Sequence, residues 1–366
     1  MEEEDSNSVQ DSSYINDIRH PSDFKGITFS KYKKTEVRDS CLENMSKGKV
    51  EPSCYWCAEL ICAGHFTDIW DIFLFFLGKY IHLGNPKLTI YLDQRYQMFR
   101  TIMENALYTQ ELQLRNNIQI RRLFAEVMSV IIKSPHKHHL TPLKKISDDD
   151  FDMNTMSEKL KAPTTKLVDE IFLEEDPKEL YIALNEFAYQ LTQTQGTMMA
   201  TYWLEWILEF DAFCKKRDVP CHCQRRSQVP VAATLQSDVV WMIWDALQLV
   251  CKQENKGMFV KRVLDALLRL FCIKYTPATG RKRKSLLYFA IELITEGVDT
   301  PVELISDKHV VEAVVRQINN IYREIKKNEE SPQTDYLFQN MERDDSNIEK
   351  SMRKLEILVK GTYGSL

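Results

Sequence analysis

The sequence contains one dense run of positive charge at residues 281–284: Arg281, Lys282, Arg283 and Lys284. The preceding segment 276–280 is rich in turn and helix-start residues, so we expect the four side chains to be exposed at the beginning of a helix. Positive charges at that end of a helix oppose its dipole, and an anionic partner would relieve the cost. The run therefore predicts contact with nucleic acid, an anionic membrane surface or an acidic protein face. A solvated run of charge is the alternative interpretation.

Two pairs of cysteines at short spacing form a second candidate group, because their four thiolates could surround one tetrahedral zinc ion: Cys54, Cys57, Cys221 and Cys223. The first pair lies in a regular helical pattern, and the spacing of the second is unusual for zinc. Free cysteine is commonly a buried apolar residue. The sequence therefore favours ordinary reduced thiols in a reducing compartment, with no metal and no cofactor, and leaves zinc as the alternative.

Motifs for catalysis and nucleotide binding are missing. Glycine accounts for only 11 of the 366 residues, and the two-glycine frame of a phosphate-binding loop does not occur. Neither a Gly-x-Ser-x-Gly nucleophile turn nor a His-Glu-x-x-His zinc helix is present. Carboxylates are abundant, but none stands in a recognisable catalytic context. We expect a protein that is not an enzyme and takes no small-molecule substrate.

The elements that carry these residues are predicted to be helices. Apolar residues recur at spacings of three and four through most of the chain, which is typical of an all-α fold. The length suits two core-forming regions. We expect a mobile polar N-terminal tail, a first helical bundle, a linker or long loop, a second helical bundle and long amphipathic C-terminal helices, at residues 1–35, 36–134, 135–170, 171–297 and 298–366.

Two local patterns refine this division. A cap residue, a proline and a glutamate at 176–179 predict the start of a helix in the second region. Near the C-terminus, apolar stripes at 310–325 and 348–359 predict two amphipathic helices. The longest apolar run, residues 72–77, is far shorter than the ~20 residues that cross a bilayer. The first residues lack the features of a signal peptide. We therefore expect a soluble chain without a transmembrane segment.

The segment from Cys54 to Pro86 resembles the helical collar domain of clamp-loader-type ATPases of the replication–recombination class. The resemblance rests on a Tyr-Trp-x-Ala helix at 55–58, an Ala-Gly break at 63–64 and a turn that ends at Pro86. It covers about a tenth of the chain. No ATPase module is recognisable beside it, so loader activity is not implied. The resemblance implies a helical assembly domain.

Six further segments carry a wider resemblance: 29–37, 58–65, 82–87, 160–163, 176–180 and 274–277. They resemble an uncharacterised helical protein family of the large nucleocytoplasmic DNA viruses. This resemblance implies a viral protein of the virion or of the virus factory in the host cytoplasm, such as a minor capsid protein. Its expected partners are other protein subunits, either capsid or assembly proteins.

Two functional hypotheses follow from the residues and the resemblances together. The first is a non-catalytic structural or assembly protein that acts through helix-mediated protein contacts. The alternative is a nucleic-acid-associated accessory factor of replication or transcription, with a collar-like helical region and a weak nucleic-acid contact through residues 281–284. No aromatic residues alternate with those charges as stacking platforms, so the run does not predict recognition of bases.

Overall fold

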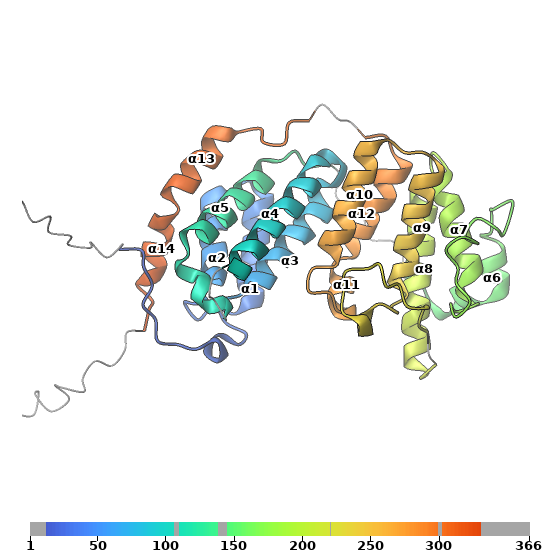
Figure 1. Cartoon of the computed structure of the whole chain (residues 1–366), viewed down its shortest axis with the longest axis horizontal. Helices are drawn as coiled ribbons and strands as arrows, with labels where there is room; N and C mark the ends of the chain where they lie inside the picture. The colour runs from blue at the N-terminus through green and yellow to red at the C-terminus, as the bar shows by residue number, and fades with distance from the viewer. Residues whose placement is uncertain (1–11, 106–109, 138–144, 220, 299–301, 331–366) are drawn as a thin grey trace, which may run out of the picture.

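The computed structural model describes residues 12–105, 110–137, 145–219, 221–298 and 302–330. Within these residues the chain forms fourteen α-helices and no strand, which confirms the predicted all-α class. The helices gather into two groups that lie next to each other along the long axis of the molecule (Figure 1). We call these groups the first bundle and the second bundle.

The first bundle combines helices from both ends of the chain: α1 (Lys34–Ser46), α2 (Val50–Cys62), α3 (Phe66–Phe76), α4 (Lys87–Asn105), α5 (Ile118–Lys133), α13 (Lys308–Gln317) and α14 (Asn319–Lys326). Its core contains a cluster of aromatic rings with neighbouring centroids 5.3–6.1 Å apart, formed by Phe66, Trp70, Phe73, Phe99 and Phe124. Such tilted and edge-on contacts add to the stabilisation that comes from burying the rings.

The second bundle is continuous in sequence: α6 (Met153–Ser157), α7 (Leu180–Thr192), α8 (Thr197–Lys216), α9 (Val240–Gln253), α10 (Met258–Phe271), α11 (Pro277–Lys282) and α12 (Lys284–Thr295). Helix α7 packs against both α8 and α9. Three of its tryptophans are almost completely buried, Trp203, Trp241 and Trp244. The aromatic helices of this region therefore form core rather than an exposed contact surface.

The two bundles meet along a seam where α10 packs on α4 and α12 packs on the π-helical turn Leu77–Ile81. Several polar side-chain contacts cross this seam, and two of them are largely buried. The guanidinium of Arg283 lies 2.7 Å from a carboxylate oxygen of Asp71, and the imidazole of His82 lies 2.8 Å from a carboxylate oxygen of Glu292. His82 is fully buried. The two bundles are therefore joined by a packed interface that contains buried polar contacts.

Residues 12–33 form a strap that is packed against the first bundle. Phe24 and Phe29 are fully buried, and the buried Arg19 donates hydrogen bonds to the carbonyls of Phe29 (2.8 Å) and Asn328 (3.2 Å). The backbone N–H of Ile18 donates to the carbonyl of Glu330 at 3.1 Å. We call these contacts between the strap and the end of the C-terminal helices the clasp. The strap differs from the predicted mobile tail, of which residues 1–11 lie outside the described residues.

The segment predicted as a linker or long loop is a loop packed on the second bundle. Residues 145–179 contain only a 3-10 turn and the short α6. Asp150 anchors them, because its carboxylate accepts from the ammonium of Lys159 (2.8 Å) and its carbonyl accepts from the indole of Trp206 (2.9 Å). Buried Val168 adds an apolar contact. The second structural unit thus begins near residue 145 rather than at 171, while residues 138–144 lie outside the described part.

The apolar stripe at 310–325 forms α13 and α14, which pack on α5 and α2 of the first bundle. The chain therefore leaves the first bundle, builds the second and returns. The second predicted stripe, at 348–359, lies outside the described residues. Among the residues that are described, no helix combines the length and the apolar character needed to cross a membrane.

Candidate binding pocket and groove

The four predicted basic residues do not form one exposed run. Helix α11 ends at Lys282 and α12 begins at Lys284, so Arg283 falls at the break between them. Its side chain is only 2% exposed and donates to Asp71 (2.7 Å) across the seam and to the carbonyl of Phe271 (2.9 Å). The expected exposure is therefore wrong for Arg283, because the helix break turns it toward a carboxylate 212 residues away in sequence.

The expected conflict with a helix dipole is also wrong for two of the residues. Arg281 and Lys282 occupy the last turn of α11, where positive charge is favourable. Both are exposed. Lys284 is half-buried and forms an ion pair with Glu205 of α8 at 2.8 Å. The predicted site is thus divided between two exposed cations, one paired cation and one structural arginine.

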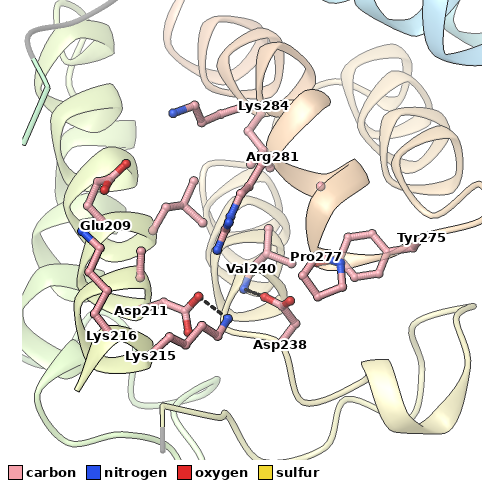
Figure 2. Close-up of a pocket in the computed structure, with 14 residues that line it drawn as sticks. Glu209, Asp211, Lys215, Lys216, Asp238, Val240, Tyr275, Pro277, Arg281 and Lys284 are labelled. Carbon is pink, nitrogen blue, oxygen red and sulfur yellow. Dashed lines mark hydrogen bonds and ion pairs between the residues drawn. The ribbon is translucent and has the colours of Figure 1, made fainter. Parts of the chain in front are cut away.

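Arg281 and Lys284 nevertheless line a common hollow with a volume of about 250 Å³. Its other walls come from the C-terminal half of α8, from the residues before α9 and from the loop between α10 and α11 (Figure 2). We call it the α8–α11 pocket and define it by six residues: Asp211, Lys215, Asp238, Tyr275, Arg281 and Lys284. Figure 2 shows the Arg281 side chain extending from α11 toward Asp211 and Lys215.

Local sequence explains why α11 presents Arg281 to this pocket. Thr276 caps the helix, because its hydroxyl accepts from the backbone N–H of Thr279 at 3.2 Å, and Pro277 occupies the first helical position. Gly280 allows the ring of Tyr275 to approach the helix closely. A Cβ atom at position 280 would lie 2.9 Å from a ring carbon of Tyr275, so a larger residue would displace the ring from the pocket wall.

The pocket contains a carboxylate with an unused acceptor. One oxygen of Asp211 accepts from the ammonium of Lys215 at 2.5 Å, whereas the other, Oδ1, is buried and has no hydrogen-bond partner. Burial raises the pKa of Asp211, and the hydrogen bond from Lys215 offsets only part of that effect. Asp238 accepts from the backbone N–H of Val240 at 3.1 Å. Burial and hydrogen bonding to Asp238 raise the pKa of Tyr275.

The pocket also contains an unused cation. Arg281 makes no hydrogen bond and no ion pair with any described residue, although its charge acts on Asp211. A guanidinium can donate two parallel hydrogen bonds to one anion. The arrangement therefore places an unpaired cationic donor in the pocket wall, whereas the free oxygen of Asp211 is buried beneath the surface.

A second hollow was missed by the sequence patterns. Two adjoining depressions of about 680 and 550 Å³ share Arg122 and Glu126 on the surface of the first bundle. We call them together the α4–α5–α13 groove. Its apolar lining consists of Met98, Ile102, Leu123, Ile305, Val311 and Val315. The available signal was the apolar pair Met98 and Ile102, four residues apart within an otherwise polar helix face, and Met98 is 47% exposed.

The candidate zinc ligands are not brought together. Cys54 and Cys57 lie on α2 of the first bundle, whereas Cys221 and Cys223 precede α9 in the second. In the part of the chain that is described, no group of three or more His, Cys, Asp or Glu residues is arranged to hold a metal ion. Burial raises the pKa of Cys54, Cys221 and Cys223 to about 12. Burial in apolar surroundings therefore favours the neutral thiol at all three positions.

Comparisons of the chain with protein-family models, with curated proteins and with solved structures find no match, so neither resemblance described above gains support from a relative.

Proposed function

We propose that the protein is a non-catalytic structural or assembly protein that acts through helix-mediated contacts with other protein subunits. The observation that carries this proposal is the α4–α5–α13 groove. Shallow apolar grooves with a polar rim are the usual receptors for an amphipathic helix. Methionine suits such a surface, because its flexible side chain adapts to the partner. We assign the groove to one amphipathic helix of a partner protein.

The charges along α13 define that partner further. Lys308, Glu312 and Arg316 line the groove at four-residue spacing, and none of them makes an ion pair with a described residue. Residues four apart lie on one face of a helix, so the three charges form a row of alternating sign. A partner helix with acidic, basic and acidic residues at the same spacing would match this row, and such complementarity selects among partners.

The resemblance to the DNA-virus family extends the proposal to a virion or minor capsid component, found in particles or in the virus factory. The collar-like segment is consistent with an assembly role, because α2 and α3 belong to the bundle that carries the groove. Mass spectrometry of purified particles from the native source tests this extension. We expect the chain in the particles, and its absence from them would contradict the virion assignment.

The alternative role on nucleic acid is less well supported by the geometry. Nucleic-acid binding depends on an uninterrupted positive surface that neutralises several phosphates. Here Arg283 is buried and Lys284 is paired, while the carboxylates Glu209, Asp211 and Asp238 line the pocket next to Arg281. Positive and negative charges therefore lie side by side at this surface, which favours a protein partner over a polyanion.

A matched pair of valine substitutions tests the groove. Val315→Glu places a charge on its apolar wall, whereas Val219→Glu places the same charge on an exposed valine of the second bundle. Crosslinking from Lys308, followed by mass spectrometry of native particles, measures partner contact. We expect Val315→Glu to reduce the crosslinks by about tenfold, the loss of roughly 1.4 kcal/mol of apolar contact, and Val219→Glu to leave them unchanged. Equal crosslinking in both variants would refute the groove as the contact.

A further inference from the structure

We propose that the α4–α5–α13 groove is covered by the chain's own C-terminal segment, residues 348–360, which binds there as an amphipathic helix and must leave before a partner helix can enter. This inference rests on the proposed function, because it takes from it that the groove accepts one amphipathic helix. The segment lies outside the described residues, so its part in the argument comes from its sequence. The chain itself thereby regulates access to the groove.

The apolar residues of the C-terminal segment have the spacing that the groove requires. They recur at intervals of four, three and four residues: Ile348, Met352, Leu355 and Val359. At about 100° per residue, a helix places all four side chains within about 80° of one another. A single narrow stripe of this kind suits a shallow apolar groove. The groove offers it an uncovered apolar surface, on which the side chain of Met98 is 47% exposed.

A row of charges runs beside this stripe. The residue after each apolar one is charged, and the signs alternate: Glu349, Arg353, Glu356 and Lys360. In a helix these four positions lie about 100° from the stripe, on one flank. The charges of α13 along the groove read positive, negative, positive, and the first three of the segment read negative, positive, negative. Both patterns are the same in either direction, so Arg353 meets Glu312 whichever way the helix runs, and opposite charges meet on both sides of that pair.

The connection to the groove is long enough for binding within one chain. The described residues end at Glu330, which the clasp holds next to α14. Val315 in the groove wall is no more than about 30 Å away, measured back along α14 and α13. Residues 331–347 can extend over about 55 Å. A tethered segment within reach acts at an effective concentration of about millimolar, so the chain's own segment is favoured over that of a second copy.

Zero-length carbodiimide crosslinking of the purified full chain tests this binding, because it joins an ammonium to a carboxylate in direct contact. Equal amounts of isotope-labelled and unlabelled chain are mixed before the reaction. We expect Lys308 to be joined to Glu349 or Glu356 of the same chain. Crosslinks between labelled and unlabelled chains would assign the groove to a second copy and overturn the proposal. The absence of crosslinks from Lys308 to the C-terminal segment would also overturn it.

A matched pair of substitutions in the segment tests the apolar stripe. Leu355 belongs to the stripe, whereas Ile357 falls on the opposite side of the helix, about 180° from Ile348. We expect Leu355→Glu to lower the yield of crosslinks between Lys308 and the segment by about tenfold, because a charge replaces a buried apolar side chain. Ile357→Glu should leave the yield unchanged. Equal yields in the two variants would exclude binding through the stripe.

A charge exchange tests the pairing between the segment and α13. Glu312→Lys or Arg353→Glu alone places like charges opposite each other, and each should lower the yield of crosslinks from Lys308 to Glu349 or Glu356 by about fivefold. The two substitutions together restore opposite charges and should recover the yield. Glu312 is exposed, so its replacement leaves the bundle core intact. A double variant that recovers nothing would contradict the proposed pairing.

Crosslinking in native particles separates this inference from the assembly role. Leu355→Glu uncovers the groove and should raise the crosslinks between Lys308 and the partner, whereas Val315→Glu should lower them. Partner crosslinks that fall in Val315→Glu but do not change in Leu355→Glu would exclude coverage by the chain's own segment and leave the assembly role standing.

Discussion

In each of two irregular segments of this chain, one buried arginine makes several hydrogen bonds, but the two arginines use different acceptors. On the first bundle, Arg121 holds the strap and donates to the carbonyls of Arg115 (2.7 Å) and Ser13 (3.1 Å). On the second, Arg226 holds the loops around α7 and α9 and pairs with the carboxylates of Asp176 and Asp245, both at 2.7 Å. Both arginines are 2% exposed. Neutral acceptors lose little when a buried cation is removed, whereas carboxylates are left as unpaired buried charges.

The largest effect is expected when Arg226 is replaced. Arg226→Met leaves Asp176 and Asp245 without their cation, and breaking a buried ion pair from one side costs about 3–5 kcal/mol. Urea unfolding followed by tryptophan fluorescence measures this, because four of the six tryptophans belong to the second bundle: Trp203, Trp206, Trp241 and Trp244. Arg225→Met is the control, since Arg225 is exposed and bonded to neutral Gln236. A decrease of less than about 1 kcal/mol in the free energy of unfolding of Arg226→Met would contradict the difference expected between the two arginines.

A smaller effect is expected for the arginine of the strap. Arg121→Met leaves only neutral groups unsatisfied, at a cost of about 1–3 kcal/mol, although it also removes a cation that stacks over Tyr322 at 3.9 Å. Hydrogen exchange should show faster exchange of strap amides such as that of Ile15. The adjacent exposed Arg122 provides a matched control as Arg122→Met. A destabilisation equal to that of Arg226→Met would show that the nature of the acceptor is unimportant.

The smallest expected effect is a loss of stability of the strap at low pH. Burial alone would raise the pKa of Asp17, but hydrogen bonds from Arg19 and from the backbone of Glu330 outweigh burial and lower it. Stability from this carboxylate is therefore complete above its unfolded pKa of about 4 and is lost as the pH falls through its folded pKa. We expect the free energy of unfolding to fall by about 0.5–1 kcal/mol, because solvent screens this ion pair. Hydrogen exchange of the strap between pH 5 and 2 measures it, and Asp17→Asn should remove the dependence.

Acid acts with the opposite sign on Asp245, one of the two carboxylates that Arg226 holds. Burial raises the pKa of Asp245, and the hydrogen bond from Arg226 offsets burial only in part. The folded form therefore binds that proton more readily than the unfolded form, so protonation of this group does not favour unfolding. The clasp should open at a higher pH than the loop residues next to Asp245 and Arg226. Simultaneous exposure of both segments to exchange would contradict this order.

The helices could be predicted from the sequence, because the apolar stripe of a helix consists of residues that are close together in the chain. Stripes at 310–325 and through the second region form helices where the periodicity placed them. The expected start at 176–179 is displaced, since α7 begins at Leu180 and Asp176 pairs with Arg226 instead of capping the helix. That partner lies 50 residues further along the chain. Local patterns carry no information about such a pairing.

The candidate site was only half predictable for the same reason. Residues 281–284 stood out by charge, and Arg281 and Lys284 do line the pocket. The sequence could not distinguish them from Arg283, whose inward direction depends on Asp71 in the other bundle. Asp211 was missed, because one aspartate on a long helix looks like any solvated carboxylate until neighbouring elements cover it. The strap was likewise predicted as a mobile tail because its composition is polar. Its packing depends on α14 and on buried arginines.

The clasp has a consequence for biosynthesis. Residues 302–330 complete a bundle that residues 12–133 begin, so a ribosome must release nearly the whole described chain before that bundle can close. The second bundle, being continuous in sequence, can fold on the nascent chain earlier. Until α13 and α14 arrive, the apolar faces of α5 and α2 that they cover stay open to solvent and to chaperones. Premature termination after the end of α12 at Thr295 and before residue 302 would therefore leave a folded second bundle attached to an unfinished first one.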